Sequence, residues 1–210
     1  MQMHPKTGPT RLLLADDHRI FRDGLKLLLL TEPDLQLVAE LDNLTELLAV
    51  VKQSEPELLL LDYHMPGGDT SAHIDYLKQR DPELKIIVLT GSHSPVLLQQ
   101  LLQVQADAVL LKNGDAAELR TAIRAVLAGE RYVSSAVQEL IAENDIQLTS
   151  REFQILKLVC DGLSNNEIAE ALSLSPKTTD KHRENLMRKL EVNNVAQLMK
   201  KALQMGLFAS

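Results

Sequence analysis

The chain has 210 residues, of which 45% are hydrophobic and 24% charged, as is usual for globular proteins with room for one large domain or two smaller ones. One cysteine, Cys160, excludes an intramolecular disulfide and favours a reducing compartment, so we expect a cytoplasmic protein. Residues 1–10 lack the apolar stretch of a signal peptide, and no apolar run approaches the length of a membrane span, so we expect no membrane partner.

Charge is distributed unevenly along the chain. The net charge is −7, which taken whole argues against nucleic acid as a partner. Residues 146–210, however, carry nine basic and seven acidic side chains, and the rest of the chain carries 13 basic and 22 acidic ones. An acidic front part and a mildly basic back part indicate two functions in one chain.

Short apolar runs alternate with helical patterns in the front part. Because alternating strands and helices are typical of a buried parallel sheet, the pattern predicts an α/β domain. The expected strands are Leu12–Ala15, Leu35–Glu40, Leu58–Leu61, Ile86–Leu89 and Ala108–Leu111.

Polar side chains follow four of these runs directly. Asp16 and Asp17 follow the first, Asp62 the third, Thr90 the fourth and Lys112 the fifth. The carboxyl ends of parallel strands share one edge, where ligands bind in such folds, so we expect three carboxylates, a hydroxyl and an ammonium to converge there. Clustered carboxylates favour a hard cation such as Mg²⁺, and one of them is able to act as a nucleophile towards phosphorus.

The same segments resemble the receiver domain of response regulators over residues 10–128. By that resemblance Asp62 is the phosphoacceptor, and Mg²⁺ is held by Asp16, Asp17, Asp62 and the backbone carbonyl of His64. The phosphoryl group is expected from a phosphohistidine on a sensor histidine kinase. The resemblance rests on the motifs LLLADDHRIFRDGLKLLL, LLLLDYHMPGGD, IIVLTGS and AVLLKN.

Two further residues take roles from the resemblance. Thr90 corresponds to the switch hydroxyl and Lys112 to the phosphate-binding lysine. One departure concerns the position three residues before the lysine, where receivers usually carry Tyr or Phe and this chain has Val109. A receiver that serves as a phosphate-independent dimerisation or protein-binding platform is therefore an alternative.

Three histidines, His18, His64 and His93, are expected near this edge of the sheet. A His–Asp cluster is able to bind a transition metal, but the spacing matches no zinc pattern, and we interpret them as ordinary rim histidines. Aspartate-nucleophile phosphatases place a general-acid Asp two residues after the nucleophile, where this chain has His64. We therefore expect no enzyme beyond the receiver's own phosphoryl transfer and dephosphorylation.

The front part ends in a helical pattern from Ala116 to Leu127, closed by Gly129. Residues 130–146 are more polar and contain one short helical stretch, 136–142. We interpret them as a linker, and an extension of the last receiver helix stays open.

Helix starts in the back part follow from capping logic. Thr149 with Glu152 and Ser164 with Glu167 form capping boxes, and Ser175 is an N-cap followed by proline. With a last helix around residues 195–203, four short helices result. Two of them joined by a tight turn describe a helix-turn-helix, whose second helix fits a major groove.

Residues 148–207 resemble the LuxR-type domain of NarL/FixJ regulators without a gap. The resemblance implies double-stranded DNA as the partner, a recognition helix over 176–190, and a homodimer formed through a last helix near 194–205. The expected DNA contacts are Lys177, Thr178, Lys181, Arg183 and Arg188. Thr179 stands where Val is usual, and Asp180 stands where a basic residue is common.

The expected protein is thus a two-component response regulator that acts as a phosphorylation-controlled transcription factor. Its fold is predicted as a flavodoxin-like (βα)5 receiver with a five-stranded parallel sheet, followed by an all-α four-helix helix-turn-helix domain. The expected boundaries are 10–129 for the receiver, 130–146 for the linker and 147–210 for the DNA-binding domain.

Overall fold

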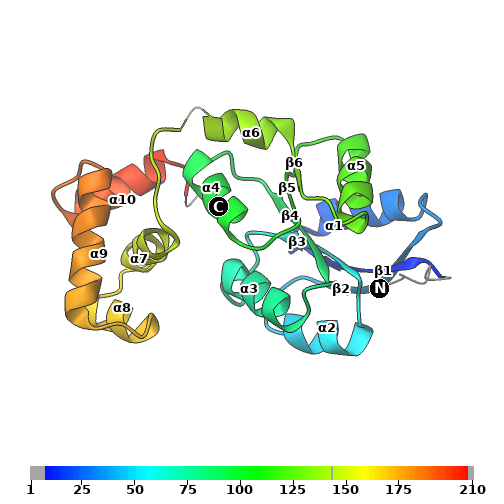
Figure 1. Ribbon diagram of the computed structural model, residues 1–210, viewed down its shortest axis with the longest axis horizontal. Coiled ribbons are helices and arrows are strands. Elements are labelled where there is room, and N and C mark those ends of the chain that lie inside the picture. The colour runs from blue at the N-terminus through cyan, green and yellow to red at the C-terminus, as the bar shows by residue number, and fades with distance from the viewer. Residues whose placement is uncertain (1–7, 143, 208–210) are drawn as a thin grey trace. The chain divides into compact units, whose positions relative to one another are not determined.

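The computed structural model describes residues 8–142 and 144–207 (Figure 1). These residues divide into two compact units. The first contains the chain up to Gly91 together with Val104–Ser134, and the second contains Ser92–Gln103 together with the chain from Ser135 onward. No helix in the described part of the chain is long and apolar enough to span a membrane.

The first unit is built on a parallel sheet, as predicted. The strand order is β2-β1-β3-β4-β5-β6, and every neighbouring pair is parallel. The four runs in the centre of the order are buried along most of their length, which explains their near-continuous apolar sequence. The strands are β1 (Thr10–Ala15), β2 (Leu35–Leu41), β3 (Leu58–Asp62), β4 (Lys85–Thr90), β5 (Ala108–Leu111) and β6 (Tyr132–Val133).

The described residues form a six-stranded sheet, one strand more than the five predicted, within the predicted parallel architecture. Residues 132–133, which fall in the predicted linker, add β6 alongside β5. The Tyr132 amide donates to the Asp107 carbonyl at 2.9 Å, and the Ser134 amide donates to the Val109 carbonyl at 3.2 Å. Two residues are too few to show the alternating hydrophobic pattern of a strand, so the sequence does not predict β6. The strand forms by pairing with the edge of β5.

Helices α1 (Arg19–Leu29) and α5 (Ala116–Leu127) cover one face of the sheet. They bury alternate strand residues, among them Leu12, Leu60 and Leu89, against their own leucines and isoleucine. Helices α2 (Leu47–Ser54) and α3 (Thr70–Arg80) lie on the opposite side of the sheet (Figure 1).

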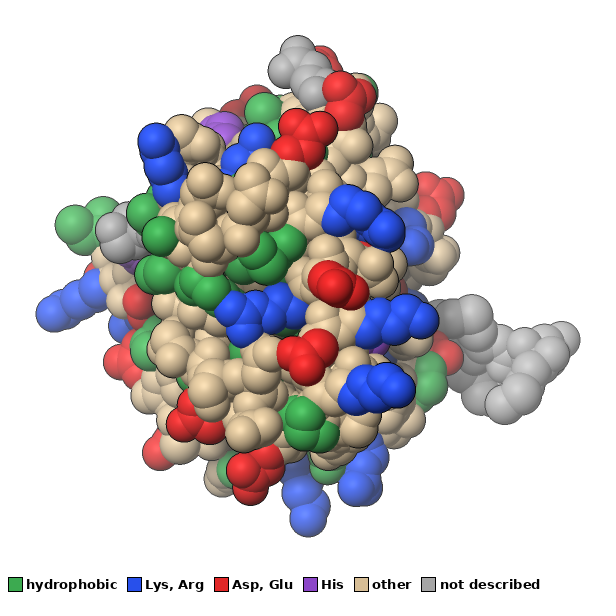
Figure 2. Space-filling model, turned by 90° about the vertical axis from the view of Figure 1, so that its left-hand side faces the viewer, with side chains coloured by type: hydrophobic (Ala, Val, Ile, Leu, Met, Phe, Trp, Pro, Cys, Tyr) green, Lys and Arg blue, Asp and Glu red, His purple; other side chains and the backbone are tan. Residues whose placement is uncertain are grey.

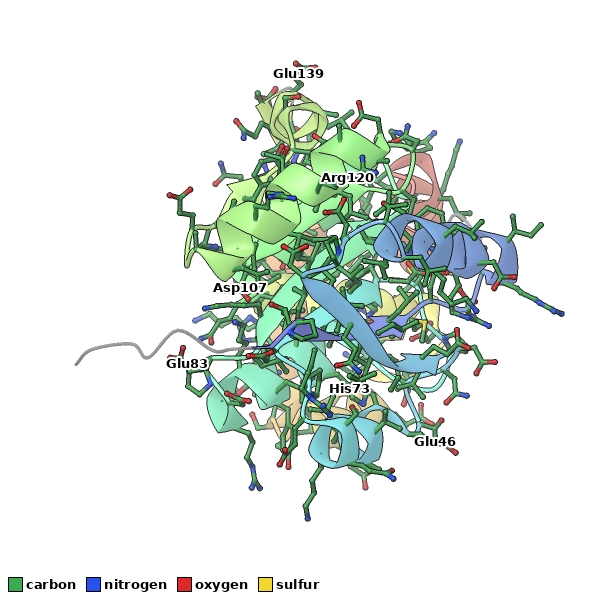
Figure 3. The ribbon with its side chains drawn as sticks, turned by 90° about the vertical axis from the view of Figure 1, so that its right-hand side faces the viewer. Glu46, His73, Glu83, Asp107, Arg120 and Glu139 are labelled. Carbon is green, nitrogen blue, oxygen red and sulfur yellow. The ribbon has the colours of Figure 1, made fainter. Side chains whose placement is uncertain are left out.

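The direction of the strands can be followed in Figure 3. Glu83 and Asp107, which precede β4 and β5, lie on the left of the view, and Glu46, which follows β2, lies on the right. The carboxyl ends of the strands therefore share the edge on the side of Glu46. This is the edge at which the polar residues after each strand are placed.

The second unit is helical. Both predicted capping boxes are present, and Ser175 caps the helix that begins at Pro176. The tight turn between α8 and α9 contains Ser173 with a φ of 53°. The helices are α4 (Pro95–Gln103), α6 (Ser135–Ala142), α7 (Ser150–Cys160), α8 (Asn165–Ala171), α9 (Pro176–Lys189) and α10 (Val195–Gln204).

The core of the last four helices is small and apolar. Helix α9 packs against both α7 and α8, and α10 packs against α7. Fully buried side chains come from each of these helices, including Ile155, Leu156, Ile168, Leu186 and Leu198. Their spacing agrees with the apolar positions read from the sequence, so the four predicted helices of this region are confirmed.

Candidate functional site

Four of the predicted site residues meet at the carboxyl edge of the sheet. Asp16 follows β1, Asp62 ends β3, Thr90 ends β4, and Lys112 follows β5. The parallel register aligns Asp62 with Leu89, the neighbour of Thr90, and the Lys112 amide donates to the Thr90 carbonyl at 2.8 Å. Buried strands thus fix the backbone from which these side chains project.

Lys112 joins the two buried carboxylates. Its Nζ lies 2.7 Å from Asp62 Oδ2 and 2.8 Å from Asp16 Oδ2. Asp16 and Asp62 are 0% and 1% exposed, so their negative charges are removed from water and need a cation close by. The ring of Phe21, with its centroid 4.9 Å from the same nitrogen, covers the ammonium.

Asp17 and His18 complete the cluster on its open side. His18 Nδ1 lies 2.8 Å from Asp17 Oδ1, 3.4 Å from Asp16 Oδ1 and 3.6 Å from Asp62 Oδ2. Ligand atoms of Asp16, Asp17, His18 and Asp62 all lie within 4.8 Å of one another. The structure therefore places a histidine inside the carboxylate cluster, whereas the sequence interpretation left it at the rim.

Thr90 and His64 are held close to the same edge. Thr90 is fully buried at the end of the strand beside β3. The backbone N–H of His64 donates to Asp62 Oδ1 at 3.1 Å, which places the loop after β3 against the carboxylate. The His64 ring packs edge-on against Tyr63, with centroids 5.0 Å apart, and so has a contact of its own.

The environment of Asp62 disfavours its charged form. Burial raises the pKa of Asp62 above its usual value, and the hydrogen bond and charge of Lys112 offset only part of that effect. The nearby carboxylate of Asp16 adds to the increase. An added positive charge at the cluster would therefore stabilise the ionised form of Asp62.

The donor set fits a divalent cation. Asp16 Oδ2 is buried and accepts no hydrogen bond, although the Lys112 ammonium lies 2.8 Å away. An oxygen in this state is able to accept a further cation or a water that is bound to one. Oxygen ligands from two or three carboxylates and the adjacent loop are the set that Mg²⁺ prefers.

Val109 occupies the position at which receivers usually carry an aromatic ring. It is 1% exposed and pairs with Val88 of β4 and Val133 of β6. The side chain is thus packed in the interior of the sheet, and no ring is available there to turn inward.

The basic residues of α9 do not form one group. Lys177, Lys181 and Arg188 are exposed and spaced by four and seven residues, which places them on one stripe of the helix together with Glu184. Figure 2 looks onto the side of the molecule that carries α9, and Lys and Arg side chains there alternate with acidic ones. We call Lys177, Lys181 and Arg188 the basic stripe.

The other two predicted contacts, Thr178 and Arg183, are engaged inside the unit. Thr178 shares a hydrogen bond with the N-cap hydroxyl of Ser175, at 2.7 Å. The Arg183 guanidinium donates to Asn165 Oδ1 of α8, and the amide nitrogen of Asn165 donates to Asp180. This chain of polar contacts ties α9 to α8, so Asp180 is not a free acid beside the stripe.

Helix α10 exposes an apolar row. Val195, Met199 and Leu203 are 36%, 41% and 64% exposed and repeat every four residues. Their opposite neighbours Leu198 and Ala202 are buried in the core. One face of α10 is thus available for another apolar surface.

Three functional residues were not identified as such from the sequence: His18 as part of the cluster, Phe21 over Lys112, and Asn165 as the partner of Arg183. His18 follows the acidic pair directly, which is a usable signal. Phe21 and Asn165 are 91 and 18 positions from the residues they contact, and nothing local predicts either pairing.

Two family models match consecutive parts of the chain. Residues 12–124 match the response regulator receiver domain, and residues 146–202 match the luxR family of bacterial regulatory proteins. Together these matches cover most of the chain.

Individual relatives resemble the chain over nearly its whole length. It is 32% identical to the nitrate/nitrite response regulator protein NarL of Escherichia coli K12, over 89% of this chain and 91% of NarL. It is 33% identical to the oxygen regulatory protein NreC of Staphylococcus aureus strain JH9, over 92% of this chain and 97% of NreC. The structure of RcsB from Salmonella enterica serovar Typhimurium, bound to promoter rprA in the presence of the phosphomimetic BeF3−, is similar with a TM-score of 0.75, at 29% identity over 92% of this chain and 98% of RcsB.

Proposed function

This chain belongs to the response regulators that combine a receiver domain with a luxR-family domain, and on that premise we propose that phosphorylation of Asp62 controls its binding to DNA. The phosphoryl donor is a phosphohistidine on a sensor histidine kinase, and the output is transcription regulation by a homodimer in the cytoplasm. The single observation that carries the proposal is the ammonium of Lys112, which lies within 2.8 Å of two buried carboxylates at the edge of the sheet.

Asp62 has the surroundings of an acceptor. It is buried, its Oδ1 accepts a hydrogen bond from the His64 amide, and its Oδ2 lies 2.7 Å from Lys112 Nζ. Both oxygens of the carboxylate are therefore held in place. In the transfer, a P–O bond to Asp62 forms as the P–N bond of the donor breaks, and the leaving imidazole nitrogen takes up a proton. The receiver's only other chemistry is hydrolysis, in which water attacks the phosphoryl group of Asp62, the bond to the carboxylate oxygen breaks, and inorganic phosphate leaves.

Mg²⁺ at the cluster is part of this proposal. Asp16, Asp17 and Asp62 would hold it together with the carbonyl of His64, and it would neutralise charge on the phosphoryl group. Lys112 would move from the paired carboxylates to a phosphoryl oxygen, while the Thr90 hydroxyl would donate to another. The movement of the Lys112 ammonium and the Thr90 hydroxyl towards the phosphoryl oxygens is the proposed local change on phosphorylation.

DNA binding is assigned to α9. Its basic stripe is exposed along one face, as a helix in the major groove requires, with Lys177, Lys181 and Arg188 on phosphates or base edges. We propose Thr178 and Arg183 as groups that set the position of α9. The apolar row on α10 is the proposed dimer contact, because pairing two copies buries Val195, Met199 and Leu203.

The test is a labelling assay read together with DNA binding. Wild-type protein with Mg²⁺ is expected to accept phosphate from acetyl phosphate or a phosphorylated kinase and then to bind DNA more tightly. Asp62→Ala is expected to lose all labelling and the phosphate-dependent gain in DNA binding. Labelling that survives Asp62→Ala would refute the acceptor assignment.

One observation favours an alternative, a receiver that acts as a phosphate-independent platform for dimerisation or protein binding. Val109 fills the aromatic position and is packed in the sheet, so the usual inward-turning ring is absent. Incubation with beryllofluoride and Mg²⁺ separates the two functions. A change in oligomeric state supports phosphate control, and an unchanged dimer supports the platform.

A further inference from the structure

The His18 side chain contacts the carboxylate cluster and does not cap its own helix. It is the N-cap residue of α1, yet its side chain makes no capping hydrogen bond. Its backbone N–H donates to Asp16 Oδ1 at 2.8 Å, which fixes where the ring starts. The imidazole is 63% exposed, so its contacts with the carboxylates, and not burial, account for its position.

The ring nitrogen Nδ1 of His18 lies among the oxygens that would coordinate a cation at the carboxylate cluster. It lies within 3.6 Å of oxygens from three different aspartates and 3.2 Å from Lys112 Nζ. At 2.8 Å from Asp17 Oδ1, Nδ1 is placed to donate its proton to that carboxylate. When the proton is on Nε2 instead, Nδ1 presents a lone pair to which Lys112 is able to donate. The same lone pair is available to a metal cation.

The size of the cluster suits one ion. Two ligands on an ion at about 2.1–2.3 Å lie at most about 4.6 Å apart, and the four ligand atoms lie within 4.8 Å of one another. Asp16 Oδ2 is buried and accepts no hydrogen bond from the described residues, although the Lys112 ammonium lies 2.8 Å away. A small rotation of the exposed Asp17 or His18 side chain would bring all four within range.

We propose that His18 is a direct nitrogen ligand of the divalent cation at the Asp16–Asp17–Asp62 cluster, and that it raises the affinity of the site for Co²⁺ relative to Mg²⁺. Imidazole adds little for Mg²⁺, which favours oxygen ligands and dehydrates reluctantly, but it strengthens binding of later first-row ions. The inference rests on the proposed use of this cluster as a cation site, and it adds the ion preference that His18 confers.

The test uses the full chain without a histidine tag. Mn²⁺ bound to wild-type protein is examined by pulsed electron paramagnetic resonance for coupling to a ¹⁴N nucleus, and Co²⁺ and Mg²⁺ affinities are measured by calorimetry. We expect ¹⁴N coupling in the wild type and its loss in His18→Ala. We expect the ratio of Co²⁺ to Mg²⁺ affinity to fall at least about 10-fold in this variant.

His64→Ala is the matched control, because it removes the other imidazole next to Asp62 and is expected to keep the coupling. His18→Ala loses no side-chain cap, so the fold should persist, and His18→Gln is a second variant that retains the size of the side chain. The inference is overturned if Mn²⁺ does not bind the wild type, if the bound ion shows no ¹⁴N coupling, or if the coupling survives both His18 variants. Failure of Asp62 to be labelled would instead remove the proposed phosphoacceptor and leave the nitrogen signal in place.

Discussion

The two units treat charged side chains in opposite ways. The first unit buries Asp16 and Asp62 and places Lys112, which is only 14% exposed, between them. The second unit keeps its basic stripe in solvent and pairs one buried acid, Glu152, with the more exposed Lys189. The buried charges of the first unit are unfavourable by themselves and are stabilised when a ligand or a phosphoryl group binds beside them. The exposed charges of the second unit are accessible to an external polyanion.

The largest effect is expected from Lys112→Ala. This change leaves two buried carboxylates without their cation, and breaking such a pair costs about 3 kcal/mol or more. Without Lys112 the pKa of Asp62 rises further, so its ionised form is penalised at neutral pH, and the variant should regain stability as the pH falls through that raised pKa. Urea denaturation of the receiver transition at several pH values measures this.

Asp62→Asn provides the control for that prediction. With one carboxylate already neutral, Lys112→Ala should cost clearly less in the Asp62→Asn background than in the wild type. Equal costs in the two backgrounds would show that Lys112 and Asp62 are not energetically coupled.

A smaller effect is expected for the corresponding pair of the second unit. Burial would raise the pKa of Glu152, but hydrogen bonds from Lys189 and from the Thr149 backbone and hydroxyl outweigh it, so the pKa is lowered. A lowered pKa contributes stability above the ordinary value for Glu, and that stability is lost as the pH falls through the folded-state pKa.

Lys189→Ala should therefore destabilise the helical unit by about 1–2 kcal/mol at neutral pH, since Lys189 Nζ lies 2.7 Å from Glu152 Oε2 and is itself 37% exposed. The difference from the wild type should shrink below the usual pKa of Glu. Calorimetry over about pH 3–7 checks both statements. A stability difference between Lys189→Ala and the wild type that does not change with pH would contradict them.

The basic stripe and the Arg183 contact are expected to respond differently. Lys181→Ala should weaken DNA binding by about 1 kcal/mol and lower the salt slope of log K by about 1, without changing the melting temperature. Arg183→Ala should also lower the stability of the helical unit, because it releases Asn165 and Asp180.

Lys52→Ala on α2, which removes the same charge from the first unit, is the control for Lys181→Ala. Titrations at several salt concentrations, with thermal melts of the same samples, separate the two roles. If Lys181→Ala and Lys52→Ala weaken binding equally, the stripe is not the contact surface.

The smallest effect is a gain in stability. Thr179 is completely buried and its hydroxyl has no hydrogen-bond partner. Because a buried unpaired hydroxyl is costly, Thr179→Val should stabilise the helical unit by about 1 kcal/mol, or raise its melting temperature by about 4–8 °C. Thr179→Ser retains the hydroxyl and removes a methyl group, so it should lower the melting temperature instead.

The sequence by itself determined the elements whose signals are local. Continuous apolar runs followed by Asp16, Asp62, Thr90 and Lys112 located both the parallel strands and the edge where these residues meet. The capping boxes fixed the starts of α7 and α8 to the residue, because each cap bonds only three positions along the chain.

Only the tertiary structure decided what depends on segments distant in the sequence. Residues 132–133 pair with the edge of β5 as a sixth strand, and Asn165 of α8 accepts a hydrogen bond from Arg183. The fold also turned His18 over the carboxylates and buried the Thr179 hydroxyl. In each case the arrangement depends on a contact with a residue far away in the sequence. The fold decides which residue that is, so a local sequence pattern does not predict it.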